Sequence, residues 1–111
     1  MAHPIRSVVP LRADITGDVT TQAMLQDDDQ QGLPAGGPGL EAGGRVVLGT
    51  ATQVDVTVLD ANGLVLYDVN ALGADIDIEP DAHGVMMPLT VTTDNISDAA
   101  HTLTVYWFVK K

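Results

Sequence analysis

The chain of 111 residues contains no cysteine, which excludes disulfide cross-links, thiolate nucleophiles and sulfur-ligated zinc sites. Basic residues are also scarce: five Lys and Arg stand against fifteen Asp and Glu, for a formal net charge of −10. This charge repels phosphate backbones, so we expect no nucleic-acid partner. No apolar run approaches the ~20 residues of a membrane span, and the N-terminal stretch lacks the pattern of a secretion signal. We therefore expect a soluble protein with no membrane partner.

Aromatic residues are few as well, and three of the four stand side by side at Tyr106, Trp107 and Phe108. Glycine and aspartate, which disfavour helices, are common, whereas the glutamate and lysine of exposed helix surfaces are rare. Valine and threonine, which suit a pleated surface, are abundant. The composition and length together predict a single all-β domain.

The second half of the chain carries a regular strand pattern. Residues 53–59 alternate apolar and polar, an Asn62-Gly63 turn follows, and residues 64–69 return, which predicts a hairpin. Residues 89–93 and 101–109 flank a polar connection and predict a second hairpin. Short strands with turns about every ten residues indicate an antiparallel β-sandwich, jelly-roll-like in form, with its core in residues 45–111.

The first half is less regular. Pro4 and Pro10 restrict residues 1–22 to an irregular N-terminal arm or edge strands. Residues 23–44 are first acidic and then dominated by glycine and proline, which neither pair well in a ladder nor fill a core. We expect this segment to be a long surface loop of the same domain.

The last strand places large apolar groups on both of its faces, because neighbouring side chains point in opposite directions. Leu103, Val105, Trp107 and Val109 form one face, which we expect to be core. Tyr106 and Phe108 lie on the other face and need a cover, either the N-terminal arm or a neighbouring subunit. The residues that we expect at a partner or subunit interface are apolar and come from both ends of the chain: Ile5, Val8, Val9, Leu11, Tyr106 and Phe108.

Two acidic clusters are candidates for a hard cation, since carboxylates suit calcium or magnesium. They are Asp27–Asp29 and the alternating Asp75, Asp77 and Glu79. The favoured interpretation is a solvated loop for the first and an exposed strand face that discourages edge pairing for the second. Three scattered histidines make no metal-ligand spacing, and no nucleophile or phosphate-binding motif is present. We expect no enzyme activity, no cofactor, no metal and no small-molecule substrate.

Several pieces of residues 53–109 resemble the capsid decoration, or cement, proteins of tailed bacteriophages. The pieces are Leu59-Asp-Ala-Asn-Gly63, its return Leu64-Val-Leu-Tyr67, the segment Pro88-Leu-Thr-Val-Thr92, and His101-Thr-Leu-Thr-Val-Tyr106. The resemblance implies a compact β-domain, homo-oligomeric with a trimer favoured, which binds the major capsid protein on the outside of the phage head. It also implies synthesis in the bacterial cytoplasm and a final location in the virion.

Two alternatives to this interpretation remain open. The first is a neck or tail structural component of the same kind of virion. The second comes from a different class and is motivated by the acidic clusters: a carbohydrate- or calcium-binding β-sandwich module.

Overall fold

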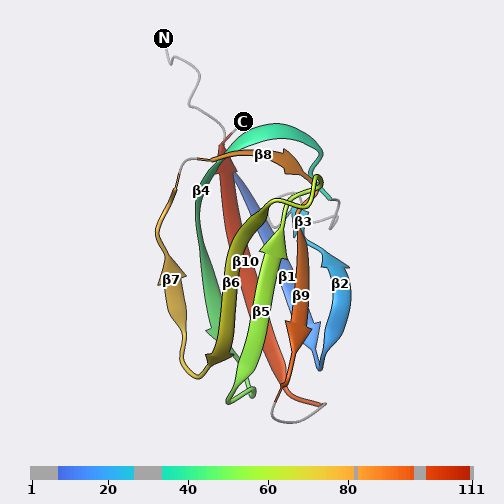
Figure 1. Cartoon of the computed structure of the whole chain (residues 1–111), viewed down its shortest axis with the longest axis vertical. Coiled ribbons are helices and arrows are strands. Elements are labelled where there is room, and N and C mark those ends of the chain that lie inside the picture. The colour runs from blue at the N-terminus through green and yellow to red at the C-terminus, as the bar shows by residue number, and fades with distance from the viewer. Residues whose placement is uncertain (1–7, 27–33, 82, 97–99, 111) are drawn as a thin grey trace.

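The computed structural model describes residues 8–26, 34–81, 83–96 and 100–110, and these form two antiparallel β-sheets with no helix among them. The two sheets face each other and enclose the core between them (Figure 1). The predicted all-β antiparallel sandwich is confirmed, and its jelly-roll form stays a prediction. Within the described ranges, no helix is long and apolar enough for a membrane crossing.

The six-stranded sheet has the order β3-β1-β10-β4-β7, and β8 also pairs with β4. Its members are β1 (Val8–Thr16), β3 (Leu25–Gln26), β4 (Gly37–Leu48), β7 (Ile76–Ile78), β8 (Gly84–Met87) and β10 (Thr102–Lys110). The strand β10 is the centre of this sheet. It pairs along its whole length with β1, from Val8 opposite Lys110 to Thr16 opposite Thr102, and on its other side with β4.

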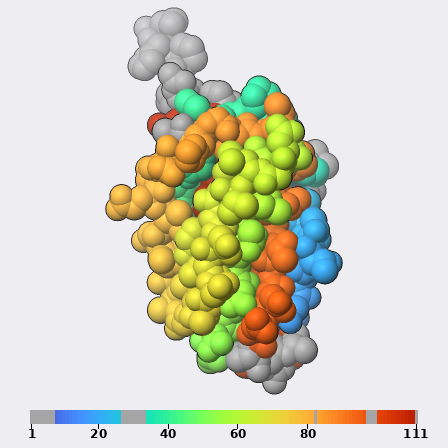
Figure 2. Space-filling model, in the orientation of Figure 1, coloured from blue at the N-terminus to red at the C-terminus, as the bar shows by residue number. Residues whose placement is uncertain are grey.

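The four-stranded sheet has the order β2-β9-β5-β6 and lies toward the viewer in Figure 1. Its members are β2 (Val19–Ala23), β5 (Val54–Leu59), β6 (Val65–Leu72) and β9 (Thr90–Asp94). The predicted hairpin between β5 and β6 is confirmed, and Gly63 in its turn has a φ of 86°, which glycine adopts without strain. This sheet is the one seen from outside in Figure 2.

The core follows the alternation of the strands. In β5 the three valines Val54, Val56 and Val58 are buried, while the residues between them are partly exposed. In β10 the predicted core face of Leu103, Val105, Trp107 and Val109 is buried. Each such side chain contributes about 1.5–3 kcal/mol when it is removed from water.

The N-terminal part of the described chain is not an arm. The strand β1 lies beside the central strand and contributes Leu11, Ala13 and Ile15 to the core, so the division that left residues 1–22 outside the core is wrong for 8–16. Pro10 is accommodated because β3 pairs only with Leu11 and Arg12, which leaves the preceding residue without a ladder partner on that side.

The predicted Gly/Pro-rich loop over 23–44 is also wrong where the structure describes it, because residues 37–44 belong to the twelve-residue strand β4. The glycines make room for large neighbours on β10. A Cβ at Gly44 would lie 2.3 Å from Cε3 of Trp107, and one at Gly39 would lie 2.4 Å from Cγ1 of Val109. A bulge at this point of β4 is centred on Gly43, whose φ is 102°.

The second predicted hairpin does not form. The strand β9 pairs with β2 and β5 in the four-stranded sheet, whereas β10 pairs with β1 and β4 in the other sheet. The polar connection after Asp94 therefore crosses from one layer of the sandwich to the other.

Candidate functional site

The outer surface of the six-stranded sheet combines aromatic, aliphatic and basic side chains, and we call it the aromatic face. Residues directly opposite one another on neighbouring strands share a face, so the register fixes its membership. The aromatic face consists of Val8, Pro10, Arg12 and Asp14 on β1, Leu25 on β3, Leu40, Arg45 and Val47 on β4, Asp77 on β7, and Thr104, Tyr106, Phe108 and Lys110 on β10.

Tyr106 and Phe108 lie at the centre of this face. Both side chains are half-buried, and together with Arg45 and Val47 they line a shallow depression in the surface. Phe108 stands opposite Pro10, and Tyr106 stands between Arg12 on one neighbouring strand and Arg45 on the other. An aromatic anchor flanked by arginines is the combination that protein interfaces favour at their centres.

The described basic residues are gathered on the aromatic face, although the chain as a whole is strongly acidic. All three lysine and arginine residues within the described part of the chain, Arg12, Arg45 and Lys110, lie there. Arg12 and Arg45 contact Asp14 and Asp77, each at 3.5 Å. Such exposed ion pairs contribute about 0–1 kcal/mol, so a partner's carboxylates can replace them readily.

The predicted interface residues divide between this face and the core. Val8 is 45% exposed on the aromatic face, which also carries the half-buried Tyr106 and Phe108. Val9 and Leu11 are only 9% and 0% exposed, so their predicted place at an interface is wrong: they alternate with Val8 on β1 and point into the sandwich. Ile5 lies outside the described residues.

Sequence reasoning missed the basic members of the face. Arg12, Arg45 and Lys110 lie on three strands whose pairing joins distant parts of the chain. The alternation within a strand shows which residues share a side, but it does not show which strands are neighbours.

The outer surface of the four-stranded sheet is acidic and rich in threonine. Asp55 stands opposite Asp94 across β5 and β9, and Thr57 stands between Asp68 and Thr92. The side-chain amide of Asn95 donates to Asp55 at 2.6 Å and the Ala71 N–H donates at 2.8 Å; these bonds lower the pKa of Asp55 despite some desolvation. This outer surface therefore carries carboxylates, whereas the aromatic face carries Arg12, Arg45 and Lys110 together with Asp14 and Asp77.

The acidic clusters do not form a cation site in the described part of the chain. Asp75 accepts a hydrogen bond from the Leu48 N–H at 2.8 Å, and Asp77 contacts Arg45. No group of three or more His, Asp or Glu there is arranged to hold a metal ion. Asp27–Asp29 lies outside the described residues.

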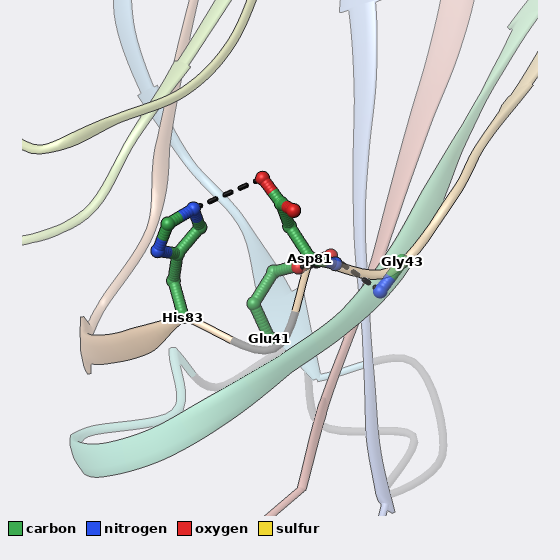
Figure 3. Close-up of polar contacts among 4 residues, drawn as sticks. All are labelled: Glu41, Gly43, Asp81 and His83. Atoms are coloured by element: carbon green, nitrogen blue, oxygen red, sulfur yellow. Dashed lines mark hydrogen bonds and ion pairs between the residues drawn. The ribbon is translucent and has the colours of Figure 1, made fainter.

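Glu41 is the buried carboxylate of the six-stranded sheet, and Figure 3 shows its surroundings. One carboxylate oxygen accepts the N–H of Gly43 in the β4 bulge, and the other accepts the N–H of Asp81 at 2.7 Å. The N–H of Glu41 donates to the His83 carbonyl at 2.8 Å. Glu41 therefore fastens the segment before β8 to the bulge, which is a structural role.

His83 and Asp81 form an exposed pair, with Nε2 and Oδ2 2.9 Å apart (Figure 3). A histidine oriented by a carboxylate is part of many hydrolytic sites, but those sites also need a nucleophile within hydrogen-bond reach. No serine lies in the described part of the chain. The pair alone therefore carries no argument for a reaction.

Asp60 is a second buried carboxylate and holds the β5–β6 turn. Burial on its own raises the pKa of Asp60. The N–H groups of Met86, Leu64 and Asn62 donate to it at 3.0, 2.9 and 2.9 Å, and together with Gly63 they outweigh that effect. The pKa of Asp60 is therefore lowered from its ordinary value of 3.8.

This lowered pKa predicts a specific dependence of stability on pH. The Asp60 contribution is fully present above pH 3.8 and is lost as the pH falls through the folded-state pKa. We expect Asp60→Asn to lower the free energy of unfolding by about 1–3 kcal/mol at pH 7, and the difference from wild type to narrow below about pH 4. Urea unfolding followed by Trp107 fluorescence measures this difference. The control is Glu79→Gln, a change at an exposed carboxylate. A difference in unfolding free energy between Asp60→Asn and wild type that stayed the same at every pH would contradict the stabilising role of the Asp60 carboxylate.

Comparison with known proteins gives no relative from which a function can be transferred: no family model and no curated protein matches this chain.

Proposed function

We propose that this protein is a structural component of a bacteriophage virion, a decoration or cement protein that docks on the outside of the head through its aromatic face. The observation that carries the proposal is the gathering of Tyr106, Phe108 and the described basic residues on one side of an acidic sandwich. The resemblance of residues 53–109 to decoration proteins favours a phage head as the assembly to which the protein binds. The role requires a binding surface and no catalysis.

Charge complementarity favours an acidic region of the major capsid protein as the occupant of the aromatic face. A second copy of this chain is disfavoured as the occupant, because two molecules that each carry a formal net charge of −10 repel one another. The aromatic face of one copy could instead bind the acidic outer surface of the four-stranded sheet of the next copy. Such an assembly would not form a closed ring, because the two surfaces lie on opposite sides of the sandwich. Such a contact builds filaments instead of discrete particles.

The size of the face suits a weak contact that is repeated many times. Nine-residue strands at ~3.3 Å per residue, with three central strands ~4.8 Å apart, cover roughly 400 Å². This is about half of the ~800 Å² per partner of a standard stable interface. A homo-oligomer, with the trimer favoured by the resemblance, would present several such faces at once and bind far more tightly than one chain.

The experiment that tests this function is a binding measurement with purified phage heads. Expanded heads stripped of decoration should bind the protein at a fixed ratio to capsid subunits, and binding should weaken steeply with added salt because charged groups contribute. Sedimentation with heads, followed by quantification of the bound protein, measures both. Binding to isolated necks or tails instead of heads would replace this proposal with the neck or tail alternative.

A further inference from the structure

The two edges of the sandwich, where the sheets end, differ in how completely they cover the apolar side chains of the core. On the side of β1 and β2, Leu11 and Met24 are both 0% exposed. On the opposite side, β6 ends the four-stranded sheet and β7 ends the six-stranded sheet, with a short connection between them (Figure 1). There Ile76 is 36% exposed, although its opposite residue on β4, Val46, is fully buried. Apolar side chains turned toward the interior are thus incompletely covered on this side.

The strand β6 is the longest unpaired edge in the described part of the structure. It has eight residues, whereas the other terminal strands β2, β3 and β7 have five, two and three. The short strand β8 is engaged on both sides, because its Met86 carbonyl accepts the Ala61 N–H at 2.7 Å. Natural edge strands are usually protected by lysine, proline, bulges or short length; β6 contains no lysine or proline, and two register shifts interrupt its pairing with β5.

The candidate stretch of this edge is Val65–Val69: a bulge at residues 70–71 interrupts the pairing with β5 at one end, and a second register shift lies at Leu66. Val65 is 55% exposed at its start. Tyr67 points inward, with its ring centroid 6.3 Å from that of Trp107, and Asp68 points outward beside Thr57. Figure 2 shows β6 at the surface of the molecule. An added strand would therefore find an apolar environment on its inner side and a carboxylate on its outer side.

We propose that the Val65–Val69 edge binds, by strand addition, a short extended segment of another protein in which apolar residues alternate with lysine or arginine. The backbone groups of the edge supply hydrogen bonds, the inward residues of the segment cover Tyr67 and Ile76, and its basic residues face Asp68. Asp75 and Glu79, which flank β7, add to the negative charge on this side of the sandwich. A second copy of this chain is disfavoured as the occupant, because it would bring an equally acidic molecule against this edge.

This binding site is separate from the aromatic face and does not depend on the proposed docking to a phage head. The probe is a capped six-residue peptide that alternates valine and lysine. The matched control peptide has the same composition with its three valines followed by its three lysines. Both carry the same charge, but only the alternating peptide presents an apolar side and a basic side as a strand.

We expect the alternating peptide to bind at least about tenfold more tightly than the block peptide in a calorimetric titration. It should also slow amide hydrogen exchange within residues 65–69. Asp68→Lys should weaken its binding about tenfold, whereas Asp14→Lys, the same charge change on the other sheet, should have a much smaller effect. Circular dichroism confirms that both variants fold. Equal binding of the two peptides, protection on other strands, equal effects of the two variants, or no binding at millimolar concentration would each overturn the proposal.

Discussion

Replacing Trp107 by alanine should lower the free energy of unfolding by about 3–5 kcal/mol, the largest stability loss that we expect from any single substitution in this chain. The indole is 1% exposed and lies at the centre of the sandwich, against Gly44 on one side and near Tyr67 on the other. Its removal leaves a cavity that the surrounding strands cannot fill without losing their register. Urea unfolding followed by circular dichroism measures the loss.

The contact with Gly44 provides an internal check on this prediction. Gly44→Ala places a methyl group where the indole ring now lies and should cost about 1–3 kcal/mol in the wild type. In the Trp107→Ala background that cost should largely disappear, because the ring is no longer there to collide with the methyl group. Phe108→Ala, a truncation on the outward side of the same strand, should cost much less. Additive effects of Gly44→Ala and Trp107→Ala would show that the two residues do not act through one contact.

Phe108→Asp should reduce binding to stripped phage heads by at least about thirtyfold, which corresponds to the ~2 kcal/mol of an interface hot spot. The substitution removes an aromatic anchor from the centre of the aromatic face and places a negative charge where we expect a negatively charged partner. The loss of folding stability should be smaller than for Trp107→Ala, because the Phe108 side chain is only half-buried. Sedimentation with heads and urea unfolding measure the two effects separately.

The matched control for Phe108→Asp is Thr57→Asp, which makes the same change of charge on the opposite face of the sandwich. It should leave binding to heads nearly unchanged. The mass in solution, measured by light scattering, separates two roles of Phe108. An unchanged mass with lost binding supports docking to the head, whereas a fall in mass for Phe108→Asp alone would identify the aromatic face as a contact between copies of this chain.

The sequence predicted those parts of the fold that depend on local pattern. The β5–β6 hairpin follows from strict alternation and an Asn62-Gly63 turn, and the inward side of β10 follows from the period of two. These features need only a few neighbouring residues. They were identified without knowledge of which other strands lie beside them.

The parts that the sequence did not predict depend on distant partners. Residues 37–44 of β4 were predicted to be a loop because glycine is a poor strand former, and only the presence of Trp107 and Val109 on the neighbouring strand explains why glycine is needed there. Likewise, β9 and β10 follow each other with a polar connection of hairpin length, yet each finds partners from other parts of the chain. The sequence did not predict the basic residues of the aromatic face for the same reason. Arg12 and Arg45 share that face only because both stand opposite Tyr106 on β10.

The central position of β10 has a consequence for the order of events in the cell. The strands β1 and β4 do not pair with each other. Both pair with β10, which the ribosome synthesises much later. During translation both remain without that partner until β10 has left the exit tunnel. The six-stranded sheet, and with it the outer surface that carries Tyr106 and Phe108, therefore closes in a late step. Sheets built from such non-local pairings fold more slowly than helical proteins of the same size.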